Sequence, residues 1–177
     1  MSELQKQNPG NRIWNLIEKI MDIVLRKMLH LKLNEEQWDG LVQFVKFGIV
    51  GLSNTIVSYV IYVGALLLFQ KEGWLPKTDY LVAQVIAFIL SVLWSFYWNN
   101  RFVFKQEENE ERNLLHALIK TYVSYAFTGL FLNSVLSLLW VEVFAIPKIV
   151  APIINLVVSV PINFLMNKFW AFKGKKK

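Results

Sequence analysis

Cysteine is absent from the 177-residue chain, and histidine occurs only twice. The lack of cysteine excludes disulfides, thiolate metal sites and cysteine nucleophiles. Charged residues are also scarce: they make up 18% of the chain, whereas 55% is hydrophobic and 15% aromatic. A soluble domain of this length carries more charge and interrupts its apolar stretches with polar positions. The composition therefore indicates an integral membrane protein.

Four long apolar segments are separated by short polar ones. Each is long enough to cross a hydrocarbon core of about 30 Å, at about 1.5 Å of rise per residue. We predict an all-α integral membrane protein whose four transmembrane helices form two tandem hairpins, preceded by an N-terminal amphipathic interfacial helix. The expected spans cover about residues 42–69, 80–98, 122–144 and 149–169. The expected divisions are a polar start with the surface helix (1–40), a first hairpin (41–104), a charged linker (105–119), a second hairpin (120–172) and a basic tail (173–177).

Residues 12–33 have a helical period that gathers apolar side chains on one face. Charges every few residues exclude a membrane span in this segment. Two interpretations stay open. The helix lies on the cytoplasmic surface of the membrane, or it packs against the span ends or a partner subunit.

The second and fourth spans are similar to each other. When residues 150–172 are set under residues 82–104, eight of the 23 ungapped positions are identical. The matches include polar positions, with Ser91 over Ser159 and Asn99 over Asn167, which membrane composition alone does not explain. The upstream spans resemble each other more weakly. The pattern predicts a duplicated helical hairpin.

Lysine and arginine flank the spans unevenly. They concentrate in the N-terminal flank, the central linker and the C-terminal tail, whereas the two remaining loops hold only Lys71, Lys77 and Lys148. This distribution predicts that both termini and the linker face the cytoplasm. The two hairpins then have parallel topology, with a site possible between them. The net charge of +6 reports this topology and contact with anionic lipid, so we expect no nucleic acid partner.

Hydroxyl and amide side chains form a polar ridge along one face of the second span and another along the fourth. Each ridge ends beside a cation. Amides and hydroxyls suit the hydroxyls of a sugar, and lysine or arginine at the interface suits a phosphate. The alternative is that the cations only snorkel and fix topology. The candidate substrate-binding residues are Lys46, Asn54, Gln84, Ser91, Ser95, Asn99, Asn100, Arg101, Asn155, Ser159, Asn163, Asn167 and Lys168.

Small side chains form a stripe on the first span, at Gly48, Gly51, Thr55 and Ser58. In lipid, such a stripe allows another helix to approach closely. The stripe is compatible with a homo-oligomer, and the oligomeric state stays open.

The residues that catalysis needs do not form any recognisable constellation. There is no phosphate-binding loop, nucleophile elbow or ligand-spaced histidine pair, so we expect no catalytic residue, metal or cofactor, and no enzyme acting alone. Mid-membrane carboxylates are also missing from the sequence. This argues against a proton- or sodium-driven antiporter.

Three motifs resemble the GtrA-like family of small four-span bacterial membrane proteins: FVKFGIVGLSNT in the first span, WNNRFVF closing the second and NFLMNKFWAF closing the fourth. The resemblance covers about residues 44–172. The positions that match the family are Gly51, Asn54, Asn99, Arg101, Asn167 and Lys168.

The resemblance implies a protein of the bacterial cytoplasmic membrane that translocates a polyprenyl-phosphate-linked monosaccharide, such as undecaprenyl phosphate glucose, to the outer leaflet. It implies membrane glycosyltransferases as partners, with a cell-surface polymer such as O-antigen or teichoic acid as the acceptor. One alternative is an adaptor that organises a glycosyltransferase and moves nothing. A third interpretation is a carrier or channel for small water-soluble compounds.

Overall fold

The computed structural model describes residues 9–28, 30, 33–106 and 110–176. It divides the chain into two compact units, one up to Lys46 and one from Phe47 onward. Helices dominate both units, and four of them are long and apolar enough to cross a membrane: Glu35–Glu72, Asp79–Val103, Leu114–Val143 and Ala151–Ala171. The predicted all-α membrane fold with four spans is confirmed.

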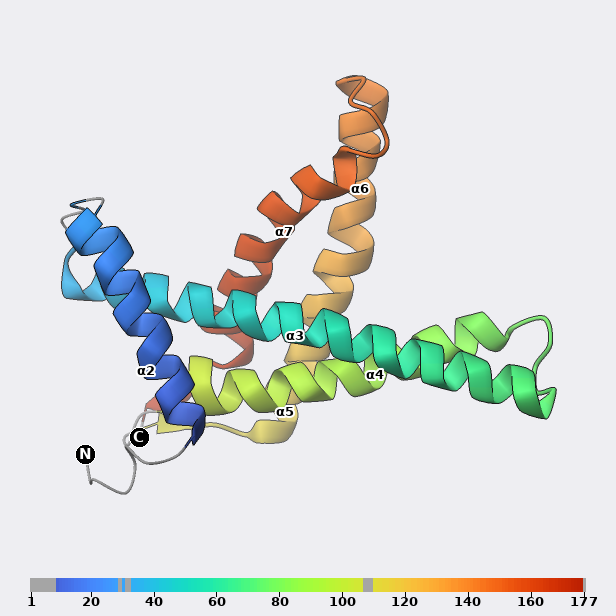
Figure 1. Cartoon of the computed structure of the whole chain (residues 1–177), viewed down its shortest axis with the longest axis horizontal. Helices are drawn as coiled ribbons and strands as arrows, with labels where there is room; N and C mark the ends of the chain where they lie inside the picture. Colours follow the sequence, from blue (N-terminus) through green and yellow to red (C-terminus); the bar gives the residue numbers. More distant parts are fainter. Residues whose placement is uncertain (1–8, 29, 31–32, 107–109, 177) are drawn as a thin grey trace. The chain divides into compact units, whose positions relative to one another are not determined.

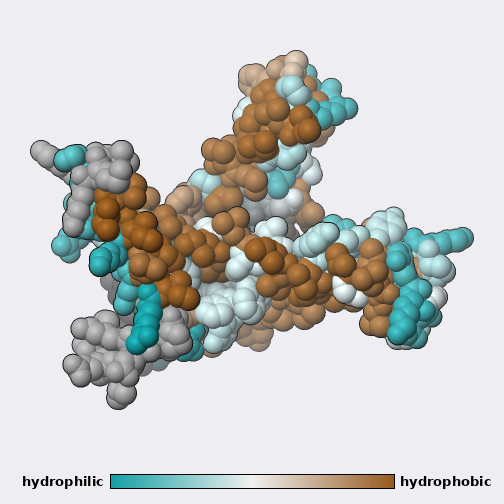
Figure 2. All heavy atoms as spheres, viewed as in Figure 1, coloured by the Kyte–Doolittle hydropathy of each residue, from teal (hydrophilic) through white to brown (hydrophobic). Residues whose placement is uncertain are grey.

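The first unit contains α2 (Pro9–Met21), which continues into the π-helical turn η1 (Asp22–Met28), and the start of α3 (Glu35–Glu72). Apolar side chains of α2 and η1 are exposed at Ile13, Leu16, Ile20, Ile23 and Val24, and Figure 2 shows apolar surface along this helix. The predicted amphipathic helix is present and ends at Met28. Its placement on a membrane surface stays a prediction.

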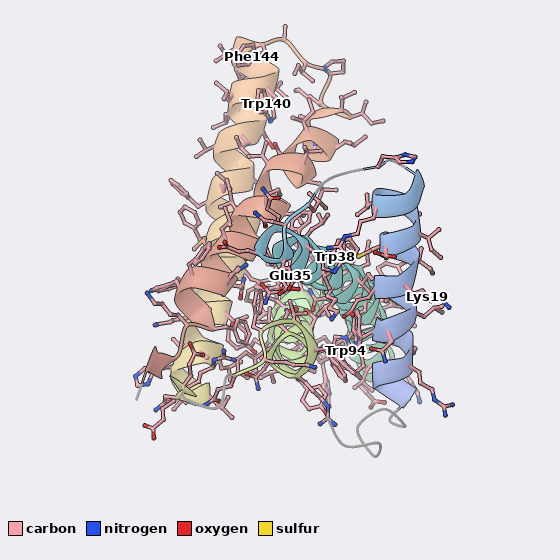
Figure 3. The ribbon with its side chains drawn as sticks, turned by 90° about the vertical axis from the view of Figure 1, so that its left-hand side faces the viewer. Lys19, Glu35, Trp38, Trp94, Trp140 and Phe144 are labelled. Carbon is pink, nitrogen blue, oxygen red and sulfur yellow. The ribbon has the colours of Figure 1, made fainter. Side chains whose placement is uncertain are left out.

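A reciprocal cap begins α3. The Gln37 backbone N–H donates to Asn34 Oδ1 (2.8 Å), and the Asn34 N–H donates to Gln37 Oε1 (3.1 Å). This capping box satisfies two backbone donors at the helix start. Figure 3 shows Trp38 and Lys19 in this unit, and the Arg26 guanidinium lies 4.3 Å from the centre of the Trp38 ring.

The first hairpin consists of α3 and α4 (Asp79–Trp98), which extends into the π-helical turn η2 (Asn99–Val103). The two helices run side by side in Figure 1. Gly73 takes a positive φ of 67° in the turn that joins them, a conformation that glycine adopts without steric cost.

The second hairpin begins with one long helical path. It passes through α5 (Leu114–Ala126), η3 (Phe127–Leu132), α6 (Asn133–Leu138) and η4 (Leu139–Val143). The path returns through α7 (Ala151–Met166) and η5 (Asn167–Ala171). Figure 1 shows α6 and α7 as this second pair.

The third helix begins earlier than the sequence pattern predicted. We expected a linker up to residue 119, but α5 starts at Leu114, where Asn113 Oδ1 accepts from the His116 backbone N–H at 3.0 Å. Asparagine is a favourable N-cap, and it starts the helix at this point. A short antiparallel pair was also not anticipated: β1 (Glu110–Glu111) pairs with β2 (Lys175–Lys176).

Phenylalanine rings form the core where the two hairpins begin and end. Phe104 stacks on Phe172 with 4.8 Å between ring centres, and Phe47 and Phe164 contact at 5.6 Å. Phe96 stacks on Phe172 at 5.4 Å. Phe104 and Phe172 occupy equivalent positions in the two repeats, so the repeated motifs close the hairpins by packing against each other.

Candidate functional site

A cavity of about 520 Å³ lies near the middle of α3 and α4. We call it the mid-span cavity. Its lining residues come from α3, α4 and α5: Asn54, Thr55, Ser58, Tyr59, Tyr62, Gln84, Ala87, Phe88, Ser91, Val92 and Tyr125. They supply amides, hydroxyls and aromatic rings, and none of them is charged. The cavity therefore offers hydrogen bonds and ring faces in the middle of the spans without a fixed charge.

Three predicted site residues meet at this cavity. Asn54 comes from α3, and Gln84 and Ser91 come from α4. The Oδ1 atom of Asn54 is buried and has no hydrogen-bond partner among the described residues. An amide oxygen that is withdrawn from water without a partner costs free energy, so this atom is suited to accept from a ligand hydroxyl.

A buried hydrogen-bond chain leads from the cavity along α4. The Tyr125 hydroxyl, at the cavity wall, bonds Ser95 Oγ at 2.6 Å, and Asn99 Nδ2 donates to the same Oγ at 3.1 Å. Ser95 and Asn99 are fully buried. Asn99 Oδ1 has no partner in the described part of the chain, so this network too retains one free acceptor.

The second ridge repeats this geometry at its end. Asn167 Nδ2 donates to Asn163 Oδ1 at 3.0 Å and to the Asn163 carbonyl at 2.8 Å. Asn99 and Asn167 each begin a π-helical turn, in which the backbone N–H of Phe104 or Phe172 donates to the asparagine carbonyl at 2.8 Å. Asn167 Oδ1 is also buried without a partner within the described residues. Each repeat therefore places a buried asparagine at the same point, with its amide nitrogen hydrogen-bonded and its amide oxygen without a described partner.

Asn155 lies apart from these groups. Its Oδ1 accepts from Trp140 Nε1 at 3.0 Å, and its Nδ2 donates to Ser137 Oγ at 2.7 Å and the Asn133 carbonyl at 3.1 Å. Figure 3 shows Trp140 near Phe144 toward the end of this hairpin. All these bonds join α7 to the helix before it, so the amide holds the second hairpin together. Ser159, one turn further along α7, is buried.

The predicted cations do not form one cluster. Arg101 is exposed beside Tyr97 and Phe102, and Lys168 lies 5.7 Å from the centres of the Phe164 and Phe169 rings. Lys46 forms an ion pair with Glu18 inside the first unit. Of the predicted cations, Arg101 and Lys168 therefore remain beside the Asn99 and Asn167 turns, and Lys46 has a structural partner.

The small-residue stripe does not pack closely within the chain. A Cβ atom built on Gly48 or Gly51 meets nothing within 4 Å in the described structure. No other described helix of the chain approaches Gly48 or Gly51 closely, and packing of this stripe against a helix of another copy stays a prediction. Ser58, at the end of the stripe, lines the mid-span cavity instead.

Sequence reasoning missed Arg112. Its Nη1 donates to Asn100 Oδ1 at 2.9 Å and to the Phe104 carbonyl at 2.7 Å. Burial lowers the pKa of Arg112, and the nearby carboxylate of Glu110 raises it in part. In the sequence, Arg112 belongs to the charged linker. Its two acceptors lie 8 and 12 residues earlier in the chain, so the sequence pattern does not show the contact. Also missed was a buried polar face on α5 and η3, formed by Thr121, Ser124 and Thr128, although its spacing of three and four residues was a readable signal.

Comparison with known proteins shows that residues 46–172 match the family described as "GtrA/DPMS, transmembrane domain". The chain belongs to this family. The match begins just before Phe47 and ends at Phe172, so it includes the mid-span cavity and both asparagine turns and leaves out most of the first unit.

This GtrA/DPMS membrane protein is similar in sequence to three proteins. It is 30% identical over 139 residues to a protein of Pyrococcus furiosus named dolichol-phosphate mannosyltransferase, over 76% of this chain and 36% of that protein. It is 30% identical over 101 residues to the uncharacterized membrane protein YwcD of Bacillus subtilis, over 57% of this chain and 79% of the relative. It is 26% identical over 98 residues to the cell wall teichoic acid glycosylation protein GtcA of Listeria monocytogenes, over 55% of this chain and 67% of the relative. The chain thus spans about a third of the length of the Pyrococcus relative.

Proposed function

We propose that the protein moves a polyprenyl-phosphate-linked monosaccharide from the cytoplasmic to the outer leaflet of a bacterial cytoplasmic membrane, for glycosylation of a cell-surface polysaccharide or teichoic acid. The observation that carries the proposal is the uncharged, polar mid-span cavity and its buried extension through Ser95 to Asn99. Family membership and the name of the Listeria relative support it.

The cavity has the properties that a sugar head group needs. Its volume of about 520 Å³ falls within the range of about 300–1,000 Å³ that is usual for ligand pockets. Asn54, Gln84 and Ser91 offer donors and acceptors for hydroxyls, and the rings of Tyr59 and Phe88 offer apolar faces. The prenyl chain stays in the surrounding lipid, so the protein has to accommodate only the head group.

The lysine and arginine distribution supports an orientation with both termini in the cytoplasm. In this orientation Asn99 and Asn167, with Arg101 and Lys168 beside them, lie at the cytoplasmic end of the spans, where a lipid-linked sugar is made. We propose that the two cations receive the phosphate there. Passage is uncoupled and is driven by consumption of the sugar outside, with no catalytic group in the chain.

The test is the leaflet asymmetry of radiolabelled undecaprenyl phosphate glucose in proteoliposomes. Wild-type protein is expected to remove the asymmetry, whereas Gln84→Leu and Asn99→Leu slow the exchange. Gln70→Leu makes the same amide-to-apolar change at the exposed end of α3, outside the cavity, and is expected to behave as wild type. If wild-type protein leaves the asymmetry unchanged for several prenyl-linked sugars, the translocase proposal is wrong.

One observation favours a second candidate, a non-transporting adaptor that anchors or organises a polyprenyl-phosphate glycosyltransferase. The Pyrococcus relative, named as a mannosyltransferase, contains the matching region as about a third of its length. For an adaptor, Asn99→Leu leaves partner binding intact and there is no exchange to lose. Co-purification of a glycosyltransferase with both wild type and Asn99→Leu, in the absence of exchange, would establish this alternative.

A further inference from the structure

A second cavity, of about 460 Å³, lies outside the mid-span cavity at the start of α5. We call it the linker pocket. Its walls come from the end of the linker, the first turns of α5 and the end of η5: Glu111, Arg112, Asn113, His116, Ala117, Lys120, Ala171 and Lys173. The pocket therefore lies between the start and the end of the second hairpin.

Three of the eight lining residues are lysine or arginine, and one is acidic. Arg112, Lys120 and Lys173 contribute three positive charges against one negative charge from Glu111, which gives +2 for the lining residues with His116 neutral. The nearby Glu110 carboxylate, which partly opposes the lowering of the Arg112 pKa by burial, offsets part of this charge. A pocket of this charge attracts a phosphate, which carries one or two negative charges and accepts several hydrogen bonds.

Two of the cations are held in place by the fold. Nη1 of Arg112 donates to Asn100 Oδ1 and the Phe104 carbonyl, and its guanidinium lies 5.4 Å from the centre of the Phe172 ring. Lys120 Nζ donates to the Trp170 carbonyl at 3.3 Å, which leaves further N–H donors of the ammonium group for a ligand. Cations fixed before binding lose less conformational entropy when the ligand arrives.

The first turn of α5 adds to this field. The backbone N–H groups of a helix start carry partial positive charge, and anions bind favourably there. The Asn113 side chain caps this start by accepting from the His116 backbone N–H, and both residues line the pocket. The helix start and the side-chain cations therefore favour the same ligand.

We propose that the linker pocket is a phosphate-binding site of this protein, separate from the mid-span cavity. It takes a phosphate group carried by a lipid head group or by a water-soluble phosphate compound. Arg112 lines the pocket and also bonds Asn100 and the Phe104 carbonyl. A ligand in the pocket therefore contacts a residue that holds the end of the first repeat. The proposal does not depend on transport.

The test is equilibrium binding to the full-length protein in phosphatidylcholine nanodiscs. One arm adds undecaprenyl phosphate to the disc, a second adds phosphatidylglycerol, and a third adds inorganic phosphate to the solution. Binding is read from the shift in melting temperature with ligand concentration. We expect Lys120→Gln/Lys173→Gln to weaken binding by about tenfold or more, since two charge-assisted contacts are lost.

The matched control is Lys71→Gln/Lys77→Gln, which removes the same charge from the loop of the first hairpin and is expected to bind as wild type. Stabilisation by undecaprenyl phosphate or phosphatidylglycerol that inorganic phosphate does not displace supports the site and assigns it to a lipid. Displacement by inorganic phosphate supports the site and assigns it to a soluble phosphate. Equal weakening in both double variants, or no stabilisation by any probe, overturns the proposal.

Discussion

Ser95 links Asn99 of the first hairpin to Tyr125 of the second, and its removal is a quantitative test of this network. Its Oγ bonds Tyr125 at 2.6 Å across to α5 and accepts from Asn99 at 3.1 Å, at a fully buried position. Ser95→Ala removes one oxygen and leaves little void, so the change isolates the hydrogen bonds. Two buried groups then lose a partner.

The expected loss follows from the size of such bonds in membrane proteins. Measured side-chain hydrogen bonds between membrane helices average about 0.6 kcal/mol and reach about 1.7 kcal/mol. For Ser95→Ala, with two bonds lost, we expect the free energy of unfolding to fall by about 1–2 kcal/mol. The equivalent change in the second repeat, Asn163→Ala, is expected to cost less than about 0.5 kcal/mol through hydrogen bonding, because Asn167 keeps its bond to the Asn163 carbonyl at 2.8 Å.

The assay is unfolding by SDS in mixed micelles, followed by far-UV circular dichroism, for wild type and both variants. Tyr125→Phe and the double variant Ser95→Ala/Tyr125→Phe complete a cycle that isolates the pair, with an expected coupling near 0.6 kcal/mol as a rough average. A cost for Asn163→Ala equal to that of Ser95→Ala would refute the reasoning, as would zero coupling between Ser95 and Tyr125.

Three further predictions concern other parts of the chain. Asn155→Leu removes three hydrogen bonds between α7 and the preceding helix and is expected to lower stability by about 2 kcal/mol in the same assay; an unchanged unfolding curve would show that the Trp140 contact is dispensable. Gly51→Ala is expected to leave stability unchanged or raise it by up to about 1 kcal/mol, because its Cβ meets nothing within 4 Å, and a loss of a dimer by light scattering would assign this face to contact between copies. Because the chain lacks cysteine, single cysteines report topology: Lys77→Cys is expected to react with an impermeant maleimide from outside and Gln106→Cys only after permeabilisation, and the reverse pattern would contradict the orientation.

The spans and the asparagine turns were predictable because their signals lie within single helices. An apolar run of sufficient length predicts a span whatever its neighbours do, and Asn99 and Asn167 stand out because a polar residue is costly there. Of the five residues that follow each asparagine, only the last is identical, Phe104 over Phe172. These two residues make the same backbone bond to their asparagine, a likeness that the sequence pattern had not predicted.

Contacts between elements could not be read in the same way. Arg112 looks like a linker charge until the fold brings its guanidinium to Asn100 and Phe104. Asn155 has the same sequence character as Asn99, yet its partners on the facing helix use its whole amide. Partners of this kind depend on helix rotation and crossing, which the periodicity of one segment does not determine.

In the proposed translocation, the phosphate of the lipid-linked sugar has to pass a neutral cavity in the middle of the spans. The cavity volume of about 520 Å³ is many times the roughly 30 Å³ that one liquid water occupies, so the proposed passage leaves room for water around the phosphate although no lining residue is charged. A fixed cation there would bind the phosphate strongly and slow its exit, since passage requires sites that the permeating group can leave. The cations lie instead at the helix ends, at Arg101 and Lys168 and around Arg112, where the proposed function has the lipid-linked phosphate dock. The separation of neutral amides from terminal cations therefore supports the proposed passage, because a charged head group can dock at the helix ends and is not retained between them.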